Sequence, residues 1–197
     1  MKKLFLITLV LFMTISLALA ANGNIQVGQA INSEGQGEEV QLQVQMQAGS
    51  YQNEAGEQMQ IQAQGGESQG MTLRVGGIET KTTMIMTQEQ AQNKTQLKVQ
   101  LSNGKNAEVK VMPDAASETA INRLQLKVCN SENNCSIELK EIGSGNQTRA
   151  AYEIKAEKQV KVLGLFKAQM QVQAQVDSEN GEVIQTKKPW WSFLATN

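Results

Sequence analysis

The sequence predicts an α+β protein that is predominantly antiparallel β with one short helix. Apolar residues alternate with polar ones, mostly glutamine, in segment after segment of residues 38–111, which is typical of strands with one buried and one solvated face. A single stretch after Pro113 has apolar residues at helical spacing instead. These two patterns divide the chain into an antiparallel β region, residues 38–111, and a helix-plus-antiparallel-sheet region with one disulfide hairpin, residues 112–197.

The alternation in the first region also predicts which face of each strand is buried. Val44 lies on the apolar side of its segment and Gln45 on the polar side, so we expect Val44 in the core. Asn103-Gly104 predicts a tight hairpin between the last two strands of this region. The predicted strands cover residues 40–46, 58–64, 71–75, 84–86, 97–101 and 107–111.

The second region begins with the predicted helix. Ala116, Ala120, Ile121 and Leu124 share one helical face, and Asp114 is expected to cap the first free amides. Turn-forming residues at 177–181 separate the last two predicted strands. The strands expected after the helix cover residues 125–128, 136–142, 151–162, 168–176 and 182–187.

The first twenty residues have the organisation of a secretory signal. A basic start, Lys2-Lys3, precedes an apolar stretch, and Ala18-Leu19-Ala20 forms a small-x-small cleavage site. We therefore predict a signal peptide at 1–20, a flexible leader at 21–37 and a secreted or extracytoplasmic location. The alternative is an uncleaved segment that tethers the chain to a membrane, because the apolar stretch approaches the length of a spanning helix.

Cys129 and Cys135 are the only cysteines of the chain. In an exported protein, a polar five-residue spacer between them predicts a disulfide at the end of a hairpin. If Cys129 faced Cys135 directly in a ladder, apolar Ile137 would lie opposite Lys127, and the buried and exposed faces of the two strands would not match. We therefore expect the disulfide at a frayed end of the ladder or beside a bulge.

The composition narrows the possible chemistry. The chain has no histidine, which excludes a histidine-based catalytic triad and an imidazole metal site, and we predict no cofactor. Without the signal, the chain has 16 basic and 19 acidic residues. This weakly acidic balance argues against a nucleic-acid partner, because binding to phosphates needs an excess of basic residues.

The methionines fit core positions better than a copper site, and residues 177–182 fit a turn better than a calcium loop. Without histidine, only a pair of glutamates could carry out acid–base catalysis. We therefore predict that the protein is not an enzyme, and a glutamate-dependent enzyme is the alternative.

Three asparagines begin possible glycosylation sequons, namely Asn93, Asn134 and Asn146. All three lie at predicted turns, and Asn134 stands next to Cys135.

Two apolar segments flanked by lysines form the candidate contact surface. One is 161–167 and the other is 187–194, and together they hold both tryptophans of the chain. We predict that the second segment is ordered and packed against the first. The alternative is that both segments touch a lipid surface or a partner protein. The candidate contact residues are Leu163, Leu165, Phe166, Trp190, Trp191 and Phe193.

Four segments of the C-terminal half, 105–118, 163–167, 176–183 and 188–194, together resemble a group of uncharacterised exported proteins from archaea. The resemblance implies an archaeal envelope setting and no particular activity. The order of a helix before an antiparallel sheet, with a turn like 177–181, is also similar to PepSY-type domains, which implies a PepSY-like C-terminal half and a small binding or inhibitory module. We therefore expect a non-catalytic binding or structural module whose partner is an unknown envelope or extracellular protein or a membrane surface.

Overall fold

The computed structural model describes residues 43–64, 70–91, 94–129 and 134–196. The predicted signal at 1–20, the leader at 21–37 and the sequon residue Asn93 lie outside these ranges. The side chain of Val44 is also outside the described ones, although its backbone belongs to a strand.

Thirteen strands, one α-helix and two short 3₁₀ helices are found in the described part of the chain, and the α+β class with mostly antiparallel sheets is confirmed. The first region contains β1 (Gln43–Gln45), β2 (Gly49–Gln52), β3 (Gln58–Ala63), β4 (Met71–Val75), β5 (Ile78–Thr82), β6 (Met86–Ala91), β7 (Lys94–Gln100) and β8 (Asn106–Glu108). The second contains α1 (Pro113–Leu124), β9 (Ser136–Ile142), η2 (Gly145–Gln147), β10 (Arg149–Val162), β11 (Phe166–Asp177), β12 (Val183–Lys187), η3 (Trp190–Leu194) and β13 (Ala195–Thr196).

Strands from both regions share one nine-stranded sheet. Its order is β12-β11-β10-β9-β5-β4-β3-β2, and β13 adds to β10. Neighbouring strands are antiparallel except β5 and β9, which meet in parallel at Lys81 and Glu138. A second, four-stranded sheet has the order β1-β6-β7-β8. The parallel contact, which the sequence pattern did not predict, joins the two regions into one sheet.

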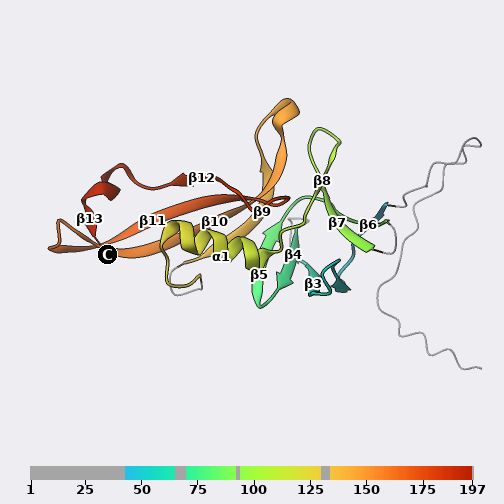
Figure 1. Cartoon of the computed structure of the whole chain (residues 1–197), viewed down its shortest axis with the longest axis horizontal. Helices are drawn as coiled ribbons and strands as arrows, with labels where there is room; N and C mark the ends of the chain where they lie inside the picture. Colours follow the sequence, from blue (N-terminus) through green and yellow to red (C-terminus); the bar gives the residue numbers. More distant parts are fainter. Residues whose placement is uncertain (1–42, 65–69, 92–93, 130–133, 197) are drawn as a thin grey trace, which may run out of the picture.

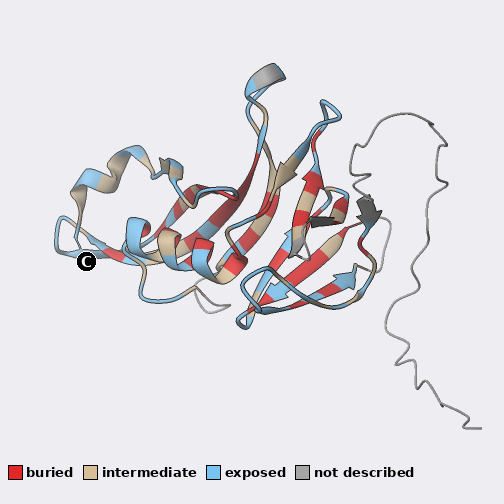
Figure 2. Ribbon diagram, turned by 45° about the vertical axis from the view of Figure 1, so that its right-hand side comes forward, coloured by how far each residue is buried: buried red, intermediate tan, exposed pale blue. Residues whose placement is uncertain are grey.

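The period-two pattern explains which side of the large sheet is buried. In β3, Met59 and Ile61 are buried while Gln58, Gln60 and Gln62 are exposed. Buried apolar residues of both sheets and of α1 form one continuous core, and α1 lies across β11 on its inner side (Figure 1). The colouring in Figure 2 shows buried and exposed residues alternating along the strands.

The helix begins two residues earlier than a cap at Asp114 requires. Met112 is the N-cap residue, and Pro113 occupies the first turn. The N–H groups of the first turn have no acceptor within the helix, so proline, which lacks an N–H, is tolerated there. The Asp114 carboxylate accepts a hydrogen bond from the Ala115 amide at 2.9 Å. Asp114 is therefore not the N-cap residue, but its carboxylate binds one of the free amides of the first turn, as predicted, and stabilises the positive end of the helix dipole.

Residues 125–128 do not form the predicted strand. Gln125 ends α1 in the left-handed conformation with φ 56°, and the amide of Leu126 donates to the Ile121 carbonyl at 3.0 Å. This closure of the helix end redirects the backbone, so the short apolar alternation here belongs to a connecting segment.

The turn at 177–181 connects the end of β11 to the segment before α1. Asp177 accepts hydrogen bonds from the amides of Glu179 at 2.8 Å and Asn180 at 3.4 Å, which makes it a turn-forming side chain. The Ser178 carbonyl accepts from the amides of Lys110 and Val111, both at 2.9 Å. The segment before α1 is therefore tied to the far end of β11.

Candidate contact surface

The hairpin of β10 and β11 extends beyond its neighbours. The β9 ladder stops where Ser136 faces Lys155, and the β12 ladder stops where Lys187 faces Gln173. From residue 156 to residue 172 the hairpin therefore continues as a two-stranded arm, with which β13 pairs near its end and one side of which is buried in the core. Figure 1 shows this arm projecting from the end of the molecule opposite β6 and β7.

The apex of the arm places a large side chain in an unfavourable backbone conformation. Leu163 has φ 52° and Gly164 has φ 71°, and the Leu165 amide donates to the Val162 carbonyl at 3.1 Å. The left-handed conformation costs a residue with a Cβ about 1 kcal/mol or more, and asparagine or glycine usually occupies it. The side chain of Leu163 is also exposed, so burial of that side chain does not offset the unfavourable backbone conformation.

The C-terminal tail lies against this apex, as predicted. The Leu163 amide donates to the Leu194 carbonyl at 2.9 Å, and β13 pairs with Lys161 and Val162 of β10. The Thr196 hydroxyl donates to the Lys161 carbonyl at 3.2 Å. These backbone contacts order the tail at the end of the arm.

Burial of the tail's aromatic side chains is only partly as expected. Trp191 is half-buried against the core, but Trp190 and Phe193 face solvent with ring centroids 6.5 Å apart. The segment is a 3₁₀ helix, in which residues three apart lie on the same side. Trp190 and Phe193 therefore share the outer side, and of the two indoles only that of Trp191 packs against the core.

Apolar exposure is concentrated at this end of the molecule. Elsewhere in the described part of the chain, the exposed large hydrophobic residues are Ile85, Val128 and Ile184. We call the following group the aromatic tip: Leu163 (63% exposed), Leu165 (78%), Phe166 (66%), Trp190 (81%) and Phe193 (75%). Soluble monomers rarely expose such a group together, and it commonly marks a surface that contacts another molecule.

A buried carboxylate lies on the outer, polar side of the large sheet. Glu153 is 4% exposed and forms ion pairs with Lys140 at 2.6 Å and Lys155 at 2.7 Å. Amides of Gln173 and Gln175 donate to its other oxygen. Burial alone would raise the pKa of Glu153, but these donors outweigh it and lower the pKa to about 2.

Glu153 faces Glu138 of β9 across the ladder, so these two residues form a glutamate pair that can be compared with the requirements of acid–base catalysis. A glutamic acid that donates protons near neutral pH needs a raised pKa, whereas the pKa of Glu153 is lowered. The two lysines and two glutamines around Glu153 therefore suit a structural ion-pair network.

An open groove of about 490 Å³ crosses the same side of β10 and β11. Asn134 and Ser136 line one wall, and Lys187, Lys188 and Pro189 line the other. No cluster of three or more metal-ligating His, Cys, Asp or Glu residues occurs among the described residues. In that part of the chain no helix is long and apolar enough to cross a membrane.

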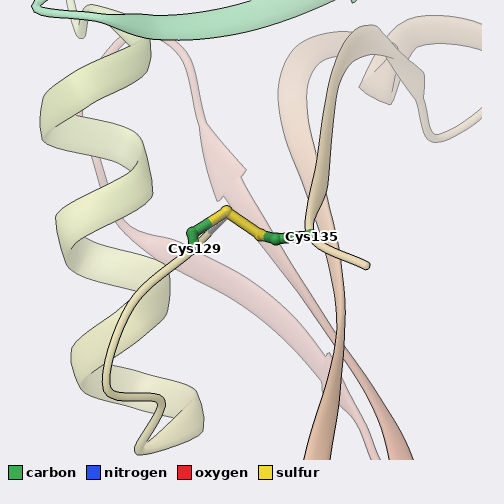
Figure 3. Close-up of a disulfide and its surroundings, with 2 residues drawn as sticks. All are labelled: Cys129 and Cys135. Atoms are coloured by element: carbon green, nitrogen blue, oxygen red, sulfur yellow. A yellow bond between two sulfur atoms is a disulfide. The ribbon is translucent and has the colours of Figure 1, made fainter. Parts of the chain in front are cut away.

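The disulfide between Cys129 and Cys135 is formed, with its Cα atoms 5.1 Å apart (Figure 3). It does not close a hairpin, because the segment before Cys129 follows the helix end and is not a strand. Cys135 directly precedes β9, in which Ile137 pairs with Ile154 of β10. The disulfide thus ties the end of α1 to the sheet, and the expected ladder mismatch between Lys127 and Ile137 does not arise.

We expect protein purified without reductant to keep its mass when treated with an alkylating agent. After unfolding in reductant, two alkyl groups should be added, one each at Cys129 and Cys135. The paired serine variant should lose about 2 kcal/mol of stability in denaturant titrations. Two thiols that react without reductant would contradict the prediction.

The other sequence-based sites are placed as follows. The Asn134 amide donates to a Glu157 carboxylate oxygen at 2.9 Å, so a glycan there would have to displace this bond. Asn146 lies in η2, and its side chain is outside the described ones. Asp177 pairs with Arg149 at 3.3 Å, and its Oδ1 accepts hydrogen bonds from amides of the predicted turn. The methionines predicted for the core are buried in it or packed against it: Met46, Met59, Met71, Met84, Met86 and Met170.

No model of a known protein family matches this chain, and the searches of curated proteins and of solved structures also find no match.

Proposed function

We propose that this chain is an exported, non-catalytic binding module of the cell envelope or extracellular space, and that the aromatic tip is its contact surface. The observation that carries the proposal is the gathering of five exposed large hydrophobic residues at the end of the arm. The two segments that supply them are more than twenty residues apart in the sequence, so the fold brings them together.

Three features support the exported setting. The N-terminal segment has the pattern of a secretory signal, and a disulfide is typical of extracytoplasmic proteins. The resemblance to exported archaeal proteins favours an envelope, and the similarity to PepSY-type domains favours a small binding module. The alternative of a tethered chain predicts an intact Met1, whereas cleavage predicts Ala21 as the first residue, and N-terminal sequencing distinguishes them.

The contact surface is tested by fractionating host cells that make a tip variant, in which Leu165, Phe166, Trp190 and Phe193 are all changed to serine. The control is Ile85→Ser/Ile184→Ser, which also removes exposed apolar side chains but away from the arm. Only molecules that begin at Ala21 are counted, so that an uncleaved signal does not retain the chain.

We expect the original chain and the control to stay with washed envelopes, and the tip variant to move at least tenfold into the soluble extracytoplasmic fraction. Burial of even one or two of these side chains supplies enough binding free energy for such a change. Equal distribution of the tip variant and the original chain would contradict the proposal.

A further inference from the structure

Charge is distributed unevenly along this molecule. Residues 156–172, which form the arm, and residues 183–196, which form β12 and the tail, contain five lysines and one acidic residue, Glu157. The rest of the chain contains 13 basic and 18 acidic residues. The five lysines are Lys158, Lys161, Lys167, Lys187 and Lys188. The apolar end of the molecule is therefore also its positive end, although the chain as a whole has a net charge of −1.

Some of these lysines repel each other. Lys161 and Lys167 stand directly opposite in the β10–β11 ladder, a position where like charges are unfavourable. Burial, followed by the nearby charge of Lys188, lowers the pKa of Lys158. The ion pairs found among the described residues include none of the five lysines. A negatively charged partner would relieve this repulsion.

Lys161 and Lys167 stand just behind the apolar apex, whereas Lys187 faces Gln173 farther along β11. Leu165 lies in the turn, two residues beyond Lys167. Interfacial protein segments place apolar and aromatic side chains about 5–10 Å into the boundary between headgroups and acyl chains, with lysines at the level of the phosphates. The order of residues along the arm reproduces this arrangement.

The size and shape of the surface favour a lipid over a protein. A stable protein interface usually buries about 800 Å² on each partner with 20–30 residues, whereas the aromatic tip has five exposed apolar residues on a projecting arm. Insertion into a membrane interface needs only a few such residues together with basic side chains.

We propose that the aromatic tip inserts into the interface of a bilayer that contains anionic lipids, with Lys161 and Lys167 binding the phosphate groups and the other three lysines adding to the attraction. This inference rests on the proposed function, since it identifies what the same surface contacts. A protein partner is the competing occupant.

Both tryptophans belong to the tail, so their fluorescence reports directly on this surface. The probe is a vesicle of dioleoylphosphatidylcholine and dioleoylphosphatidylglycerol at about 3:1, with brominated acyl chains as a quencher. We expect a blue shift and at least twofold quenching of tryptophan emission. Pure phosphatidylcholine vesicles should cause much less, and added salt should weaken binding because it screens the lysines.

Charge variants test the role of the lysines. Lys161→Gln/Lys167→Gln should weaken binding to the anionic vesicles by about fivefold for each lysine removed. The control Lys81→Gln/Lys105→Gln removes the same charge from exposed positions away from the arm and should bind like the original chain. Equal weakening by both pairs would show that only net charge matters and would overturn the proposed site.

Leu163→Asn separates binding from folding. Asparagine tolerates the left-handed conformation, so the melting temperature should stay the same or rise, while vesicle binding should fall by about tenfold. Unchanged binding would remove Leu163 from the site.

Absence of any tryptophan response to the anionic vesicles would overturn the lipid proposal. If the tip variant is still released from host envelopes in that case, the contact surface stands and its partner is a protein. If the tip variant is also retained, the proposed function fails as well.

Discussion

Changing Ile61 to lysine is expected to unfold the chain, whereas changing Gln62 to lysine should alter its stability by less than about 0.5 kcal/mol. Ile61 is 1% exposed and belongs to the core, while Gln62 is exposed on the other side of β3. Lysine at position 61 would place an unpaired charge in an apolar site, which should cost about 4 kcal/mol or more.

Denaturant titrations followed by circular dichroism measure both variants. Equal midpoints would show that the register of β3 is wrong. The sequence makes the same prediction for Val44 and Gln45, but the side chain of Val44 is not among the described ones, so the β3 pair is the sharper test.

Loss of charge at Glu153 is the second change with a large expected effect. Glu153→Gln keeps the shape of the side chain but removes the partner of Lys140 and Lys155. Because the folded-state pKa is about 2 and the ordinary value is 4.5, the charged form should stabilise the fold by about 3 kcal/mol at pH 7.

The effect has a defined pH dependence. A carboxyl group with a lowered folded-state pKa contributes its full stability above the unfolded value, and this contribution decreases as the pH falls from 4.5 towards 2. Urea titrations of the original chain and of Glu153→Gln should therefore differ most near neutral pH and converge below about pH 2. Glu118→Gln, on the exposed side of α1, is the control and should show little effect. A constant difference across this range would contradict the role of the ion-pair network.

Local patterns in the sequence were sufficient for much of the fold. The alternation around Ile61 and the helical spacing of Ala116 and Ala120 correspond to β3 and α1, because each pattern reflects burial on one face of its own element. Asn103-Gly104 forms the expected hairpin, with the Gly104 amide donating to the Leu101 carbonyl at 3.0 Å. The bounds of β9 also agree with the prediction.

Features that depend on distant parts of the chain could not be predicted in this way. The parallel contact of Lys81 with Glu138 has no local signal, and residues 125–128 alternate like a strand although the helix end determines their path. In the tail, composition indicated an apolar segment, but only the 3₁₀ geometry explains why Trp191 is half-buried and Trp190 is exposed.

The parallel contact of β5 with β9 also affects how the chain acquires its structure. Lys81 and Glu138 are 57 positions apart, and β6, β7 and β8 of the second sheet lie between them in the sequence together with α1. The hairpins on either side can form from neighbouring residues, but the sheet is complete only after this long segment has been closed into a loop. Loop closure over many residues is entropically costly and slows folding. We therefore expect joining of the two halves of the large sheet to be a late step in folding.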